Sequence, residues 1–129
     1  MTTERTVLGL GAMVFLAIGV LFLIRPEHWA TVVEITTPTA MARTDLRATY
    51  GGFSLGFGLF LGLCTLREDW LRPGLVAIGL ALAGFASARL VGFFVEGTAH
   101  RLMIIFFVLE SVGATVAFYL QARLGRHGR

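Results

Sequence analysis

The sequence predicts an all-α integral membrane protein: an antiparallel four-helix bundle with a short interfacial helix in the first outer loop. Two observations predict this fold class. The 129 residues are 56% hydrophobic, with a mean hydropathy of +0.78, which exceeds the apolar content of ordinary soluble domains. Four apolar runs each have about the 20 residues needed to cross a bilayer. Since no Ser/Pro-rich linker divides the chain, we expect a single domain over residues 1–129.

The first predicted span covers residues 6–24 and is stopped by Arg25 and Pro26. Its N-terminal flank is nearly neutral, and no small-residue cleavage site closely follows it, so we expect a retained anchor rather than a signal peptide. The loop that follows is the only long connection. Its segment Pro26-Glu27-His28-Trp29 predicts a short interfacial helix with Trp29 at headgroup level.

The other three spans are predicted over residues 46–66, 73–95 and 101–121. Thr37 and Pro38 resemble an N-cap and a first helical residue, which indicates that the second helix begins before the membrane. Pro73 is expected to open the third helix, where its missing N–H costs nothing.

An even number of spans places both termini on one side, and the arginines indicate which side. With the termini inside, six arginines are on inner segments and four on outer ones, which favours cytoplasmic termini. The inner six are Arg5, Arg67, Arg72, Arg123, Arg126 and Arg129; the outer four are Arg25, Arg43, Arg47 and Arg101. Because the basic residues are scattered in this way, the net charge of +3 does not indicate a nucleic-acid partner.

The sequence shows no pattern typical of catalytic or metal sites. Cys64 is the only cysteine and lies in an apolar run, as expected of a packed small hydrophobe. The three histidines are isolated, and HExxH, GxSxG and phosphate-loop motifs are lacking. We therefore predict no catalytic residues and no metal.

Arg89 and Glu110 are charged residues inside otherwise apolar helices. A charge at mid-span costs about 2.5–3.5 kcal/mol, so such residues usually pair and usually mark a functional site. Counted from the centre of the Glu96–His100 turn, Arg89 lies about nine residues before and Glu110 about twelve after. At a rise of 1.5 Å per residue their depths differ by about 4–5 Å, which predicts a structural ion pair across the hairpin.

Further polar residues are predicted to join this pair. Arg47 and Tyr50 share a helical stripe with Arg43, Gly51 and Ser54. We therefore hypothesise a ligand-binding site in the outer half of the bundle, formed by Asp45, Arg47, Tyr50, Arg89, Glu96 and Glu110. Two alternatives remain open at this point: the pair only locks helix register, or the carboxylates serve proton or ion movement.

Small residues recur at four-residue spacing on two of the spans. This spacing lets helix backbones approach closely, and we expect it to serve packing within the bundle, with contact to another subunit as the alternative. The residues are Gly52, Gly56, Gly58 and Gly62 on the second span and Gly84, Ala88 and Gly92 on the third.

Two segments, Asp45-Leu46-Arg47-Ala48-Thr49-Tyr50-Gly51-Gly52 and Arg89-Leu90-Val91-Gly92 with Glu96-Gly97, resemble motifs of a bacterial family of small four-helix membrane proteins, domain of unknown function 4345. The family pattern usually has glutamate at Asp45 and Asp-Gly at Glu96-Gly97. Glu110 matches an acidic residue in its last helix. The family resembles the DoxX-like group, which includes quinone-linked redox subunits. The resemblance implies the bacterial inner (cytoplasmic) membrane and, by analogy of fold, a quinone or lipid ligand.

Two functions follow as hypotheses. The first is a non-catalytic integral membrane protein, an accessory or structural subunit that packs as a homo-oligomer or with other membrane subunits. The alternative is a small-molecule, quinone or lipid-binding protein that uses the polar pocket. Apart from membrane lipid or a bound quinone, we expect no cofactor.

Overall fold

The computed structural model describes residues 2–127 and contains four helices long and apolar enough to cross a membrane. They are Thr2–Ile24, Ala40–Leu66, Glu68–Glu96 and Arg101–Gly125. No strand occurs within the described residues, so the predicted all-α class with four possible spans is confirmed. Arg129, counted above among the inner arginines, lies outside the described part of the chain.

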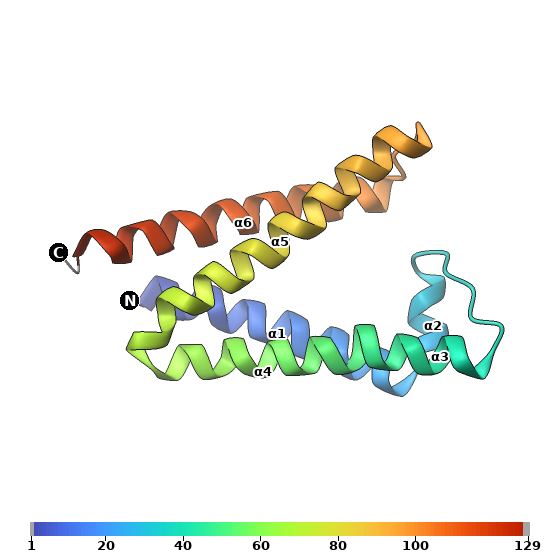
Figure 1. Cartoon of the computed structure of the whole chain (residues 1–129), viewed down its shortest axis with the longest axis horizontal. Helices are drawn as coiled ribbons and strands as arrows, with labels where there is room; N and C mark the ends of the chain where they lie inside the picture. The colour runs from blue at the N-terminus through green and yellow to red at the C-terminus, as the bar shows by residue number, and fades with distance from the viewer. Residues whose placement is uncertain (1, 128–129) are drawn as a thin grey trace.

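The elements follow one another in an up-and-down order. In chain order they are α1 (Thr2–Ile24), α2 (Pro26–Thr31), α3 (Ala40–Leu46), the π-helical turn η1 (Arg47–Gly52), α4 (Phe53–Leu66), α5 (Glu68–Glu96) and α6 (Arg101–His127). The short helix α2 has the place expected for the helix of the first loop. Both ends of the chain lie at the same end of the bundle (Figure 1), which we call the terminal end.

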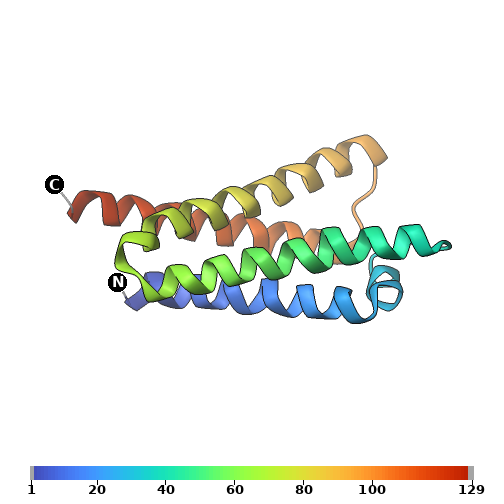
Figure 2. The same cartoon turned by 60° about the horizontal axis from the view of Figure 1, so that its bottom comes forward.

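The bundle consists of two antiparallel hairpins. In one, α1 packs along η1 and α4, and in the other α5 packs along α6. The hairpins are joined at the terminal end by the α4–α5 turn, and α5 diverges from α4 toward the opposite end in both views (Figure 1 and Figure 2). We call that opposite end, where α5 meets α6 through residues 97–100, the open end.

The hydrophobic core lies toward the terminal end, where the two hairpins are close. Its buried members come from all four long helices: Leu8, Ala12, Phe15, Leu61, Cys64, Leu71, Leu75, Ile78, Ala117 and Leu120. At the same end, Arg5 on α1 donates a hydrogen bond to the Thr65 carbonyl and pairs with Glu68 at 3.5 Å. Apolar packing and polar contacts thus hold the hairpins together toward the terminal end.

Two predicted helix starts are wrong. The helix α5 begins at Glu68, five residues before Pro73. The backbone of Arg67 is extended, so the chain turns into the helix directly after it. Pro73 is exposed and lies in the second turn of the helix. The helix α3 begins at Ala40, because the Thr39 hydroxyl accepts a hydrogen bond from the Ala42 amide at 3.1 Å. Thr39 is therefore the N-cap, rather than Thr37.

The π-helical turn η1 interrupts the second span at Arg47–Gly52. Its wider turn, in which the Phe53 amide donates to the Ala48 carbonyl, breaks the 3.6-residue periodicity assumed for the polar stripe. As a result Gly51 and Ser54 are buried while Tyr50 is exposed. The expected single stripe is therefore not continuous in the structure.

Candidate ligand-binding site

The structure brings Arg89 of α5 and Glu110 of α6 together in a bidentate ion pair. Arg89 Nε lies 2.8 Å from Glu110 Oε2, and Nη2 lies 2.9 Å from Oε1. The two side chains are only 26% and 13% exposed. Parallel N–H···O bonds of this kind fix geometry and are stronger than bonds between neutral groups. The pair therefore ties α5 to α6 in the half of their hairpin that is nearer the open end.

The remaining contacts of Arg89 come from apolar residues of α6. Its Nη1 donates to the sulfur of Met103 at 3.0 Å, and its guanidinium carbon lies 5.1 Å from the centroid of the Phe106 ring. A guanidinium has five N–H donors. Within the described residues, one N–H on each terminal nitrogen has no acceptor. Arg89 is thus neutralised in charge while two of its donors stay available.

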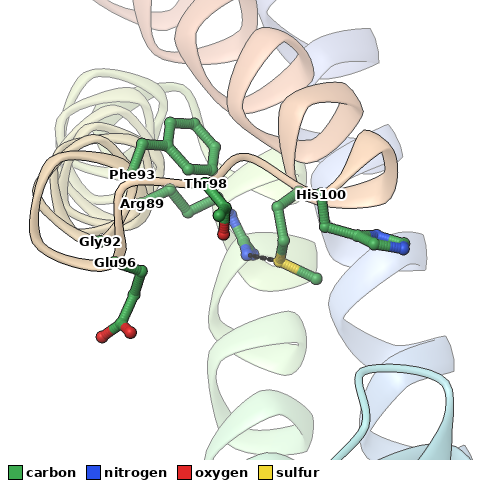
Figure 3. Close-up of a pocket in the computed structure, with 7 residues that line it drawn as sticks. Arg89, Gly92, Phe93, Glu96, Thr98 and His100 are labelled. Carbon is green, nitrogen blue, oxygen red and sulfur yellow. Dashed lines mark hydrogen bonds between the residues drawn. The ribbon is translucent and has the colours of Figure 1, made fainter.

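A cavity of about 260 Å³ adjoins Arg89 at the open end (Figure 3). It is lined by Arg89, Gly92, Phe93, Glu96, Thr98, His100 and Met103. A side chain at Gly92 would meet no atom within 4 Å, so the missing side chain leaves room there. An apolar cavity of about 150 Å³ holds benzene in another protein. The space beside Arg89 is larger but partly open to its surroundings, so it is a cleft that one ring or a short polar head with its first carbons can enter.

The rim of the cavity is formed by the turn between α5 and α6. Gly97 ends α5 with a left-handed backbone (φ 66°), which favours glycine. His100 accepts the Leu102 amide at its Nδ1, at 3.3 Å. In Figure 3 the Glu96 carboxylate and the His100 ring both point away from the Arg89 guanidinium. Arg89 and Thr98 are accordingly the lining residues whose side chains can supply hydrogen-bond donors to the interior of the cavity.

Arg47 and Tyr50 serve the other hairpin instead. Arg47 Nε donates to the carbonyl of Leu23 at 3.1 Å, one of the carbonyls that the last turn of α1 leaves without an intrahelical partner. The Tyr50 ring stacks on Phe22, with centroids 4.9 Å apart. Both contacts hold the end of α1 against η1. Asp45 is exposed, and its carboxylate has no polar partner within the described residues.

The six residues predicted to converge therefore form two groups. Arg89, Glu96 and Glu110 belong to the open end of the α5–α6 hairpin, whereas Asp45, Arg47 and Tyr50 lie where α3 and η1 meet α1. No hydrogen bond or ion pair joins the groups in the described part of the chain. The divergence of α5 from α4 separates them, and this corrects the composition of the predicted pocket.

The small residues also require a correction. Gly58 faces α1: a Cβ there would lie 2.9 Å from the Leu16 amide nitrogen. Gly56, Gly62, Gly84 and Gly92 have no atom within 4 Å of such a Cβ, Gly52 has only a carbonyl of its own helical turn at 3.8 Å, and Ala88 is exposed. Intramolecular close packing, expected at all seven positions, is thus found at Gly58. The outward glycines agree with the alternative of contact with another chain.

Sequence reasoning missed several residues of the site, namely Gly92, Phe93, Thr98, His100 and Met103 of the lining and Phe106 beside Arg89. Helical spacing could have indicated two of them. Met103 and Phe106 precede Glu110 by seven and four residues, which places them on its face of α6. It also missed Gly19, where a Cβ would lie 2.8 Å from the Leu55 amide nitrogen. Such a close approach depends on how α1 is positioned along α4, and a single glycine in the sequence does not indicate that position.

The comparisons with known proteins give one match. A family model described as "Domain of unknown function (DUF4345)" matches residues 3–121, which is nearly the whole chain and includes every residue of the cavity. No curated protein and no solved structure matches.

Proposed function

The chain belongs to the family of the domain of unknown function DUF4345, and on this premise we propose that it is a non-catalytic multi-pass membrane protein that binds a small lipid-soluble molecule. The observation that carries the proposal is the state of Arg89. Its charge is cancelled by Glu110, yet two of its N–H groups have no acceptor among the described residues, beside a cavity with mostly apolar walls. A hydrogen bond to a charged group contributes about 1.5–3 kcal/mol, so a ligand whose polar head accepts from Arg89 would be stabilised there.

A purely structural role for the pair explains less. A register lock needs the ion pair, but it needs neither an open space at Gly92 nor spare donors. Buried ion pairs can often be replaced by apolar residues at little cost in stability. The presence of Arg89 next to a cavity therefore favours a quinone-like or lipid-like ligand over a role that only locks helix register.

The cavity can be tested with a matched pair of glycine substitutions. Gly92 and Gly84 both have open space around them, but only Gly92 lines the cavity. The protein is extracted with its native lipid into nanodiscs, and bound lipids and quinones are quantified per chain. We expect Gly92→Leu to lose the retained molecule while Gly84→Leu keeps the wild-type amount. Equal contents in all three proteins would contradict a ligand at this cavity.

We further propose that the protein lies in the bacterial inner membrane with both termini in the cytoplasm. The shared location of the chain ends (Figure 1) supports this, together with the excess of arginines on the inner segments. In a Cys64→Ala background, an impermeant maleimide applied to spheroplasts should label Glu34→Cys and spare Thr3→Cys. Labelling of Thr3→Cys in intact spheroplasts would reverse the orientation.

A second candidate function, an accessory subunit or homo-oligomer, is favoured by the outward small residues. Gly56, Gly84 and Ala88 are exposed, and the two glycines leave room for the backbone of a neighbouring helix. Native mass spectrometry after mild detergent extraction should then detect a complex. A monomer without partners would count against this candidate and leave ligand binding unaffected.

A further inference from the structure

We propose that the group held beside Arg89 is a neutral carbonyl acceptor of a lipid-soluble molecule, and not an anionic headgroup. This inference rests on the proposed ligand-binding function and specifies its chemistry. An arginine in a membrane pocket would ordinarily suggest an anion. Here the charges around the cavity argue for the opposite preference.

The first step is the charge already present. Glu110 engages Arg89 through two oxygens, at 2.8 and 2.9 Å, so the pair is neutral as a unit. An added anion would leave the site with a net negative charge in a region of low dielectric, where an uncompensated charge is costly. Glu96 on the rim adds a second negative charge, and Arg101, which is exposed, is not part of the cavity lining.

The second step is the donors that remain. One N–H on Nη1 and one on Nη2 are without acceptors among the described residues. A carbonyl oxygen has two lone pairs and no donor, so it satisfies such groups without bringing a charge. Two chemical sources fit this description: the ring carbonyl of a quinone and the ester carbonyl of a neutral glyceride.

The third step is the shape of the space. About 260 Å³ is slightly less than the usual volume of a pocket that encloses a whole drug-sized ligand, about 300–1,000 Å³. Phe93 provides apolar wall surface next to Arg89 (Figure 3), and Met103, whose sulfur contacts Arg89, provides more. The cavity therefore suits a polar head and its first carbons, while the rest of an apolar tail extends into the surrounding lipid.

The test uses the methyl group of Met103 as a local reporter, because its sulfur contacts Arg89 at 3.0 Å. The ¹³C-methyl-methionine protein in maltoside detergent micelles, which contain no carbonyl group, is titrated with decyl-benzoquinone, dioctanoylglycerol or decyl phosphate, an anion without a carbonyl. We expect one or both neutral probes to shift the Met103 signal at concentrations at least about tenfold below those of the anionic probe. The probe with the higher affinity identifies the source of the carbonyl.

The outcomes separate the inference from the function on which it rests. Equal or tighter binding of decyl phosphate at Met103 overturns the carbonyl assignment but retains the ligand site. If none of the three probes shifts the Met103 signal, the proposed binding function itself fails.

A near-isosteric variant tests the charge argument separately. Glu110→Gln removes the compensating charge and leaves Arg89 positive, so the anionic probe should gain at least about tenfold in affinity relative to the neutral ones. The matched control is Glu96→Gln, which removes a charge at the rim without touching Arg89 and should change the preference less. An unchanged preference in Glu110→Gln would overturn the inference. The wild-type titration decides the question by itself if that variant does not fold.

Discussion

Arg89 illustrates how a single residue can place a charge within a membrane span. Insertion of an arginine at mid-span costs about 2.5–3.5 kcal/mol. The bidentate contact with Glu110 and the contacts with the Met103 and Phe106 side chains offset that cost locally. The position of this pair was predictable from the sequence, because helical rise is fixed and a short turn sets the relative depth of two adjacent helices.

Removal of one member of this pair should destabilise the protein more than removal of both. Arg89→Met or Glu110→Leu leaves an uncompensated charge, at a cost of about 3–5 kcal/mol, whereas the double variant should be nearly as stable as the wild type. Thermal unfolding in detergent of the four proteins gives the coupling energy.

The exposed Arg67–Asp69 pair provides the control for that cycle. Its side chains are 60% and 63% exposed, and such pairs contribute at most about 1 kcal/mol. Arg67→Gln should therefore have little effect on stability. Additive losses for Arg89→Met and Glu110→Leu would show that the two charges do not interact.

At the scale of the elements, η1 explains the polar motif of the second span without a ligand. Arg47 satisfies a carbonyl at the end of α1, and Tyr50 stacks on Phe22. Gly51 faces α1, where a Cβ would lie 3.2 Å from the Leu23 amide nitrogen. The sequence could not predict this arrangement. A π-helical turn changes which residues share a face of the helix, and nothing in the pattern of apolar residues indicates where such a turn occurs.

The glycines of α4 allow a test of helix contact with almost no change in chemistry. Gly58→Ala places a methyl group 2.9 Å from the Leu16 amide nitrogen and should cost about 1–3 kcal/mol through overpacking. Gly56→Ala meets no atom within 4 Å and should be neutral or stabilising, since alanine favours helices by about 0.5–1 kcal/mol over glycine. Differential scanning fluorimetry in detergent compares the two variants.

Equal destabilisation by the two substitutions would contradict the observed register of α1 against α4. The sequence alone treats Gly56 and Gly58 alike, because each belongs to a pair of glycines at four-residue spacing. Only the rotation of α4 about its axis, which depends on η1 before it, decides that Gly58 faces α1 and Gly56 does not.

At the scale of the whole molecule, the number of spans could be predicted and the relation between the hairpins could not. Apolar length determines the spans because backbone groups in lipid must be satisfied within helices. The helix faces that contact lipid and those that contact other helices are similarly apolar. The pattern of apolar residues therefore does not show which faces of the helices pack against each other. That is why the divergence of α5 from α4 (Figure 2), and with it the separation of Arg47 from Arg89, was not foreseen.

The two halves of the molecule thus have different roles in this account. The terminal end contains the buried cluster that holds the hairpins together, and the open end of α5–α6 contains the charged pair and its cavity. Substitutions at the open end that leave no charge unpaired should therefore change ligand retention with little effect on the core.

The most direct measurement is the lipid and quinone content of the Arg89→Met/Glu110→Leu double variant, purified in native-lipid nanodiscs beside the wild type. The variant should fold with near wild-type stability, because both charges are removed together. It should nevertheless lose the molecule that the wild type retains, because the donors beside the cavity are gone. A folded double variant with the same bound content as the wild type would show that the pair serves only to hold α5 against α6.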